Sequence, residues 1–200
     1  IVAIKSTVPP GTLEKAEKSI KEITNVKFYT ASVPEFLREG SAVEDTLHPN
    51  RIVIGANSQK VFDVLEKLHQ PLNSTILKIK PESAQMAKYA ANTYLATRIT
   101  FINQIADLCE KNGADVDDIV RAIGWDKRIG KHYWYPGLGY GGSCFPKDVK
   151  ELAAYSRAIN ENDNLFNKIN EINENRIPKL LQKIENKVDG FEGKNIAVLG

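Results

Sequence analysis

Short apolar runs alternate with amphipathic stretches over the first part of the chain. The apolar runs open residues 1–12 and occupy residues 27–32, 51–56 and 74–80. Apolar side chains recur at helical spacing in residues 12–23 and 58–68. This alternation predicts an α/β unit built on a parallel sheet with right-handed crossovers. The polar segment at residues 34–42 is expected to be partly helical.

The pattern changes at Pro81. Residues 82–112 contain no Gly and no Pro, and their apolar positions follow helical spacing in two stripes. One stripe comprises Met86, Ala90, Thr93, Thr97, Phe101, Ile105 and Leu108, and the other Leu95, Ile99, Ile102, Ala106 and Cys109. A helix with two apolar stripes must be buried on more than one side. We therefore expect one long helix that anchors a helical domain and crosses a dimer partner.

Shorter helices and one loop rich in aromatic residues and glycine follow the long helix. A short helix is expected over residues 115–124, and residues 132–148 form the loop and the start of the next helix. Helical structure is then expected over residues 165–187, where Pro178 should kink or restart it.

These patterns predict a fold class of α/β plus all-α in three parts. Residues 1–80 are interpreted as the C-terminal part of an α/β domain and residues 81–187 as a complete helical domain. Residues 188–200 are interpreted as the start of a second α/β domain, with an apolar strand running to Gly200 and a nucleotide-binding turn beginning there. Because the chain opens at Ile1 inside a predicted buried strand, we expect a segment of a longer protein.

Composition and charge narrow the classes of partner. With 42% hydrophobic and 26% charged residues, the chain resembles globular proteins rather than disordered or fibrous ones. The 27 Lys and Arg against 25 Asp and Glu give a net charge of +2 without a basic block, so neither nucleic acid nor a membrane surface is expected as a partner. No apolar run approaches the ~20 residues of a membrane-spanning helix. The 2 cysteines and 3 histidines lack disulfide or metal-ligand spacing, which favours a reducing, cytoplasmic compartment and no metal site.

Cys144 is the strongest candidate for chemistry. It follows the glycine-rich residues 141–143 and precedes Pro146, which places its thiol at or just before a helix N-terminus. The helix dipole and the nearby Lys147 both favour the thiolate, the form that attacks carbonyl carbon. Cys109 lies in an apolar stripe and is expected to be a core residue.

Lys88 and Asn92 lie one turn apart on the long helix and reach the same surface. Facing inward, they would stabilise an oxyanion and hold a water molecule; the alternative is a solvated lysine on an exposed stripe. Glu35 and Glu39 are equally consistent with a base and a cofactor contact or with a polar surface turn.

The loop at residues 133–141 interleaves aromatic residues with Gly and Pro. Such a loop suits a flat or ringed ligand such as a sugar or a nucleobase. Its aromatic side chains are alternatively local packing anchors.

Five segments together resemble the UDP-glucose/GDP-mannose dehydrogenase family. They occur in the family's order, and the resemblance extends over nearly the whole chain. They are STVPPGT at 6–12, VPEFLREGSA at 33–42, AKYAANTYLATRITFINQIADLCE at 87–110, RIG at 128–130 and GYGGSCFPKD at 139–148. The resemblance implies an N-terminal NAD-binding Rossmann domain, a central helical domain that dimerises along a long helix, and a C-terminal domain that binds the nucleotide of the substrate.

The resemblance also implies a reaction, the oxidation of the C6 alcohol of a nucleotide sugar to a carboxylate with two NAD. Cys144 would trap the intermediate aldehyde as a thiohemiacetal, and the resulting thioester would be hydrolysed. Lys88 would stabilise oxyanions and Asn92 would hold the substrate and a water molecule. Asp148 and Glu35 would manage protons, with the base for each step left open between them.

Further residues match family positions for binding. By resemblance the catalytic residues are Cys144, Lys88, Asn92, Asp148, Glu35 and Thr7, and the cofactor contacts are Ser6, Thr7, Val8, Glu39, Cys144 and Lys147. The substrate contacts are Glu35, Phe36, Leu37, Arg38, Glu39, Lys88, Asn92, Arg128, Tyr133, Tyr135, Pro136, Gly137, Leu138, Gly139, Tyr140 and Gly141, with Arg128 reaching the neighbouring subunit's site.

The chain departs from the family pattern in places. Val33 stands where many members carry Asn, and the glycine motif of the NAD domain and most of the C-terminal domain are absent. This chain alone is therefore expected to bind NAD and uridine poorly.

The motifs resemble UDP-glucose members more than GDP-mannose or UDP-N-acetylmannosamine members. A non-catalytic dimerisation segment and a hydroxyacid dehydrogenase of the wider superfamily, which needs no thiol, remain the competing hypotheses.

Overall fold

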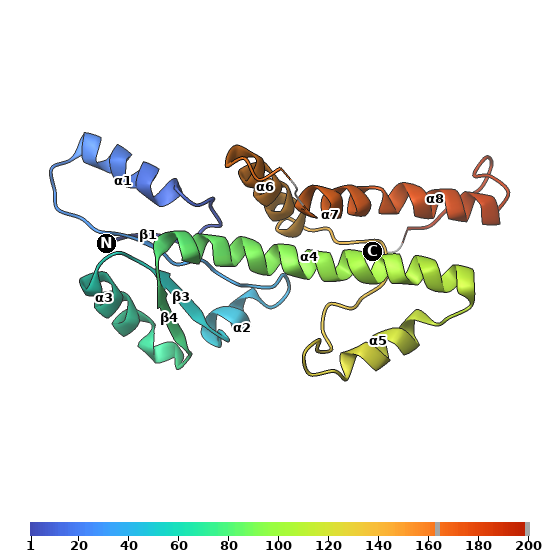
Figure 1. The fold of residues 1–200 in the computed structure, drawn as a ribbon, viewed down its shortest axis with the longest axis horizontal. Coiled ribbons are helices and arrows are strands. Elements are labelled where there is room, and N and C mark those ends of the chain that lie inside the picture. Colours follow the sequence, from blue (N-terminus) through green and yellow to red (C-terminus); the bar gives the residue numbers. More distant parts are fainter. Residues whose placement is uncertain (163–164, 199–200) are drawn as a thin grey trace. The chain divides into compact units, whose positions relative to one another are not determined.

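The computed structural model describes residues 1–162 and 165–198 and divides into two compact units, Ile1–Thr93 and Tyr94–Gly200. The long helix α4 (Pro81–Asn112) contributes to both units and is unbroken (Figure 1). Among the described residues, no helix has the length and apolar character needed to span a membrane.

A four-stranded sheet forms the centre of the first unit. Its strands are β1 (Val2–Ile4), β2 (Thr30–Ser32), β3 (Ile52–Gly55) and β4 (Ile76–Ile79), in the spatial order β1-β2-β3-β4. The pairs β1/β2 and β3/β4 are parallel, but Ser32 of β2 pairs with Gly55 of β3 in antiparallel orientation. The expectation of an all-parallel sheet was therefore wrong at this pair. The connection from β2 to β3 holds one short helix, and antiparallel neighbours need no full crossover.

Helices flank this sheet. They are α1 (Thr12–Ile23), α2 (Ala42–Leu47), α3 (Gln59–His69) and the 3₁₀ turn η1 (Gln70–Leu72), and Figure 1 draws α1 and α3 on opposite sides of the strands. The apolar face of α3 packs Val61 and Leu65 against Ile52 and Ile54 of β3 in one buried cluster. Burial of this kind is the main favourable term in forming the unit.

The segment before α2 is not helical, contrary to expectation. The helix begins at Ala42, and residues 33–38 have no regular structure. Side-chain carboxylates accept hydrogen bonds from backbone amides that would otherwise bond within a helix. Leu37 N–H donates to the Glu35 carboxylate at 2.6 Å, and Arg38 N–H donates to Asp45 at 2.8 Å. Polar side chains that bond nearby backbone groups compete with helix formation in this way.

The predicted long helix is confirmed as α4. Pro81 occupies its first position, where the missing N–H costs nothing. In the second unit, Ile102, Ala106 and Cys109 of one stripe are buried, which confirms Cys109 as a core residue. The other stripe is more open, because Phe101 and Leu108 are exposed.

Four further helices complete the described part of the second unit. They are α5 (Val116–Gly124), α6 (Phe145–Ala158), α7 (Leu165–Glu174) and α8 (Arg176–Lys187). Asp115 caps α5 by accepting a hydrogen bond from Asp117 N–H at 2.8 Å. The break falls at Asn175, so Pro178 lies in the first turn of α8 and the predicted restart is confirmed.

The last described residues form no strand. Residues 194–198 carry no regular structure, and no other strand of the described chain pairs with them. A strand requires a neighbour to satisfy its backbone groups. The turn expected at Gly200 lies outside the described residues.

Gly55 provides a test of how α4 packs on the sheet. A Cβ atom at this position would lie 2.6 Å from Ala84 Cβ and 2.8 Å from Pro81 Cα. We expect Gly55→Ala to destabilise the protein by about 1–3 kcal/mol in urea unfolding followed by circular dichroism. Gly141→Ala is the control, because it adds the same methyl group into open space. Equal stability of the two variants would contradict the close packing of α4 on β3.

Candidate active site

The buried Lys88 forms an ion pair with the half-buried Glu35 in the first unit. The Lys88 side chain is 3% exposed, and its Nζ lies 3.1 Å from Glu35 Oε1. The other Glu35 oxygen accepts the Leu37 N–H. A buried ammonium group needs such a partner, because its loss of hydration is otherwise costly. The alternative of a solvated Lys88 is therefore wrong.

Phe36 lies between two cations in the same cluster. The Arg51 guanidinium lies 3.8 Å from the ring centroid and the Lys88 ammonium 5.4 Å from it. Both distances fall within the range of cation–π attraction. Arg51, next to β3, was not predicted from the sequence, and Phe36 thereby helps to fix the Lys88 ammonium.

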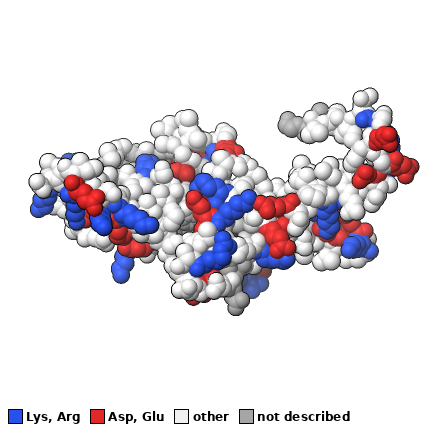
Figure 2. All heavy atoms as spheres, turned by 90° about the horizontal axis from the view of Figure 1, so that it is seen from above, with Lys and Arg blue, Asp and Glu red and all other residues white. Residues whose placement is uncertain are grey.

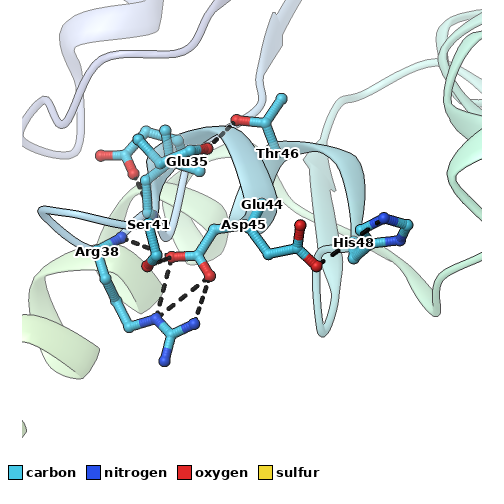
Figure 3. Close-up of polar contacts among 9 residues, drawn as sticks. Glu35, Arg38, Ser41, Glu44, Asp45, Thr46 and His48 are labelled. Atoms are coloured by element: carbon cyan, nitrogen blue, oxygen red, sulfur yellow. Dashed lines mark hydrogen bonds and ion pairs between the residues drawn. The ribbon is translucent and has the colours of Figure 1, made fainter.

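Arg38 closes the turn that carries Glu39. Its guanidinium pairs with Asp45 at 2.6 Å, and Ser41 Oγ donates to the same carboxylate at 3.0 Å (Figure 3). The hydrogen bond from Arg38 holds the pKa of Asp45 well below its usual range. Glu39 follows directly and is exposed.

The remaining first-unit candidates lie at the end of β1 and on α4. Ser6 is exposed and Thr7 and Val8 are half-buried, in the segment after the carboxyl end of β1. In parallel α/β sheets that end of a strand is where ligands bind. Asn92 is buried one turn after Lys88 on α4.

Cys144 is the N-cap residue of α6 in the second unit. Its side chain is a free, half-buried thiol, and Ser143 Oγ lies 3.6 Å from Sγ. The backbone of Cys144 begins the helix by accepting the Asp148 N–H at 2.9 Å. Cys144 therefore stands at the N-terminus of α6, as the sequence predicts.

Asp148 and Lys147 form a pair beside the thiol-bearing turn. The Asp148 side chain is 1% exposed, and Lys147 Nζ lies 2.5 Å from its carboxylate and 3.6 Å from Glu151. Burial lowers the pKa of Lys147, but the hydrogen bond to Asp148 and the nearby carboxylates outweigh it and raise that pKa. Lys147 stays protonated and offers a fixed positive charge near the N-terminus of α6.

The aromatic loop combines packing anchors with exposed rings. Trp134 and Tyr140 are buried, and Trp134 Nε1 donates to the Gly130 carbonyl at 2.9 Å. Burial and the charge of Glu174 raise the pKa of Tyr140 to about 12. Tyr135 and Leu138 are exposed. The packing alternative thus holds for Trp134 and Tyr140 but not for the whole loop.

Arg128 lies at the start of this region with an exposed side chain. Its guanidinium pairs with Asp126 at 2.6 Å, and that hydrogen bond raises the pKa of Arg128. Asp126 also accepts the Arg128 N–H at 2.9 Å, so the carboxylate orders the backbone of the RIG segment.

Sequence reasoning missed three polar residues that hold the loop backbone. They are Asn103 of α4, Asn173 of α7 and Arg176 of α8. A signal was present for the last two, because residues 173 and 176 fall four and seven positions after the buried Ile169, on the same helical face.

The structure thus gathers the predicted residues into two groups. The first unit brings together Glu35, Phe36, Leu37 and Lys88, and the second brings together Cys144, Lys147 and Asp148. On the face drawn in Figure 2, Lys and Arg lie interspersed with Asp and Glu, in keeping with the near-neutral charge. Among the described residues, no three His, Cys, Asp or Glu gather in a metal-binding group.

Sequence models of two family domains match most of the chain. The NAD binding domain of the UDP-glucose/GDP-mannose dehydrogenase family matches residues 1–73, and the central domain of that family matches residues 82–175. The chain belongs to the UDP-glucose/GDP-mannose dehydrogenase family. All five segments that carry the resemblance in the sequence lie within these two matches.

Individual relatives in this dehydrogenase family match the chain along its length. The UDP-glucose 6-dehydrogenase YwqF of Bacillus subtilis is 44% identical over all of this chain and 46% of its own length. The structure of a UDP-glucose dehydrogenase from Pyrobaculum islandicum is 40% identical, with a TM-score of 0.91 over 94% of this chain and 44% of that one. A UDP-D-ManNAc dehydrogenase from Pyrococcus horikoshii is 29% identical, with a TM-score of 0.81 over 98% of this chain and 47% of that one. The chain spans about half the length of these relatives.

One ion cluster in this family member gives a pH prediction. Asp107 of α4 pairs with Arg176 and, at 2.5 Å, with Lys179. Burial raises the pKa of Asp107, but the hydrogen bonds from Lys179 and Arg176 outweigh it and lower that pKa. A carboxyl group with a depressed folded-state pKa stabilises the fold above its unfolded pKa of about 3.9, and this contribution is lost as pH falls below that value.

We expect Asp107→Asn to lower the free energy of unfolding by about 3 kcal/mol at pH 7, because Arg176 loses its charged partner. The difference from the parent protein should shrink as pH falls below about 4, since the parent loses the same contribution there. Urea unfolding of both proteins over this pH series measures the difference in the free energy of unfolding. Asp118→Asn, which breaks an exposed pair with Arg121, is the control and should cost less than about 1 kcal/mol. A pH-independent difference would refute the assignment.

Proposed function

We propose that the full-length protein oxidises the C6 alcohol of UDP-glucose to the carboxylate, with two NAD consumed per sugar. The observation that carries this proposal is the half-buried Cys144 thiol at the N-terminus of α6, with the buried Asp148 one turn on. The buried Lys88 ammonium, paired with Glu35, supplies the cation that oxyanion intermediates need. The relatives named UDP-glucose 6-dehydrogenase support the substrate.

Several residues are proposed to hold the cofactor. Ser6, Thr7 and Val8 follow the carboxyl end of β1, where a dinucleotide suits an α/β sheet, and Glu39 and Cys144 would be further contacts with the cofactor. Lys147 keeps its positive charge and would face the cofactor as well. NAD, when bound, accepts one hydride in each of the two oxidations.

The first oxidation converts the C6 alcohol to an aldehyde. A carboxylate, Glu35 or Asp148, takes the hydroxyl proton, and a hydride leaves C6. Lys88 Nζ stabilises the developing alkoxide, because a buried ammonium acts through a low local dielectric. Asn92, one turn away, would hold the substrate and a water molecule.

The second oxidation proceeds through sulfur. The Cys144 thiolate adds to the aldehyde carbon, and the new C–S bond gives a thiohemiacetal oxyanion that Lys88 stabilises. Loss of a second hydride yields a thioester. Water, deprotonated by Glu35 or Asp148, adds to the thioester carbon and expels the thiolate, which leaves the carboxylate and restores Cys144. Alcohol, two NAD and one water become carboxylate, two NADH and three protons.

The substrate is proposed to lie along the segments that carry the remaining matched positions. These are residues 35–39 in the first unit and Tyr133 through Gly141 in the second. Exposed Tyr135 and Leu138 and the open space around Gly137 and Gly141 suit contacts with a sugar and a pyrophosphate.

We further propose three domains and a homodimer. The domains are residues 1–80, 81–187 and 188–200, the last being the start of a nucleotide-binding domain. Tyr94, Phe101 and Leu108 support dimerisation along α4, because these exposed apolar residues recur every seven positions and form one stripe. The exposed Arg128 would reach the neighbouring subunit's substrate site. Two free cysteines are consistent with a cytoplasmic protein, since the proposed nucleophile must stay reduced.

GDP-mannose and UDP-N-acetylmannosamine are the second candidate substrates. The Pyrococcus horikoshii relative named for UDP-D-ManNAc has the same fold over this region at 29% identity, which favours keeping this alternative. A non-catalytic segment and a thiol-independent hydroxyacid dehydrogenase are the further alternatives that the experiments below separate.

Stoichiometry tests the reaction and the substrate together. The full-length protein with UDP-glucose and excess NAD should release two NADH per sugar, measured at 340 nm against uronate by chromatography. GDP-mannose and UDP-N-acetylmannosamine in parallel reactions should give much slower turnover. One NADH per sugar, or turnover of GDP-mannose alone, would overturn the proposal, and no turnover of any sugar would favour a non-catalytic segment.

Replacement of the nucleophile tests the sulfur route. We expect Cys144→Ala to reduce uronate formation by at least about a thousandfold, because no covalent intermediate can form. Cys109→Ala is the matched control, since it removes the other thiol from the α4 core and should keep the activity. Full activity of Cys144→Ala would instead favour a thiol-independent dehydrogenase.

A further inference from the structure

Asn173 and Arg176 lie against the backbone of the glycine-rich loop. We propose that they are positioning residues that hold the loop, and with it the turn leading to Cys144, in the conformation that accepts the nucleotide sugar. This inference rests on the proposed function. Neither residue belongs to the motifs that suggest the reaction, and both act through the loop rather than on the substrate.

Asn173 binds Tyr140 through both ends of its side-chain amide. Its Oδ1 accepts the Tyr140 N–H at 2.8 Å, and its Nδ2 donates to the Tyr140 carbonyl at 2.9 Å. The side chain thus satisfies both backbone groups of one residue, as a neighbouring strand would. Tyr140 lies four positions before Cys144 along the chain.

Gly139 permits this close approach. Its φ is +100°, and a Cβ atom there would lie 2.5 Å from Asn173 Oδ1. The position therefore requires glycine both for its backbone conformation and for its neighbour. Gly139 and Asn173 are distant in sequence, but the contact between them needs both residues.

Arg176 fixes the other end of the loop. Its Nε donates to the Gly137 carbonyl at 2.9 Å, while its Nη1 pairs with Asp107. Asn103 Oδ1 accepts the Gly137 N–H at 2.8 Å. Both backbone groups of Gly137 are therefore bound, from α8 and from α4.

The burial of the charged Arg176 side chain indicates that it orients a loop group rather than adding stability. Its side chain is 8% exposed, and a buried ion pair stabilises a fold no better than well-packed apolar residues of similar size. The guanidinium instead supplies donors at fixed angles, which pin the Gly137 carbonyl. Held at Gly137 and Tyr140, the loop keeps Leu138 exposed and leaves Gly141 in open space. A binding loop ordered before the ligand arrives loses less entropy on binding.

Two variants of the full-length protein separate positioning from stability. Arg176→Lys keeps a positive charge for Asp107 but loses the Nε donor to Gly137, and Asn173→Ala loses both bonds to Tyr140. We expect each to raise the KM for UDP-glucose about five- to tenfold, the equivalent of one hydrogen bond. The KM for NAD should change less than about twofold, because the first unit carries the main NAD-binding segment. Asn175→Ala, an exposed neighbour whose side chain caps no helix, is the matched control.

Amide hydrogen exchange provides a readout that needs no substrate. The Tyr140 amide should exchange at least about tenfold faster in Asn173→Ala, while amides of α4 keep their rates. Unchanged exchange at Tyr140 would overturn the anchoring, and faster exchange with an unchanged KM for UDP-glucose would overturn the positioning role. Absence of turnover in the parent protein would instead refute the proposed function, with the exchange result unaffected.

Discussion

One uninterrupted helix is the constraint on which the rest of the structure depends. Residues 82–112 contain neither Gly nor Pro, and α4 runs from Pro81 to Asn112 without a break. The same helix presents Lys88 and Asn92 within the first unit and Asn103 and Asp107 within the second. Within each unit the helix fixes the angles between the side chains that it supplies, Lys88 and Asn92 in the first and Asn103 and Asp107 in the second.

Some polar residues in the interior of these units bind particular backbone or charged groups. Lys88 is paired with Glu35, and Asp107 is paired with Arg176. Asn103 accepts the N–H of Gly137. Apolar packing alone would fold such units, but it would not orient a carboxylate or a loop carbonyl, because the hydrophobic effect has no direction. The hydrogen-bonded groups supply the orientation that a reactive centre needs.

Most helices and strands could be predicted from the periodicity of the sequence. The pairing between distant strands could not. The bounds of α4 and the restart of helix near Pro178 follow from local rules of backbone geometry, as does the position of Cys144 before α6. The antiparallel pairing of Ser32 with Gly55 joins distant segments, and no local pattern encodes it. The non-helical course of residues 33–38 depends on carboxylates that bind backbone amides. Asn173 and Arg176 were missed because their partners are backbone groups, which every residue possesses.

The conformation of the glycine-rich loop depends on the number of residues at the junction of α7 and α8. Asn173 lies in the last turn of α7 and Arg176 is the first residue of α8, and both side chains bond the backbone of the same loop. An inserted or deleted residue at Asn175 would rotate one anchor away from the other by about 100°, the angle between successive helical residues. Exposed side chains along α7 and α8 can vary in size and charge without moving the loop, whereas the count of residues between the anchors cannot change.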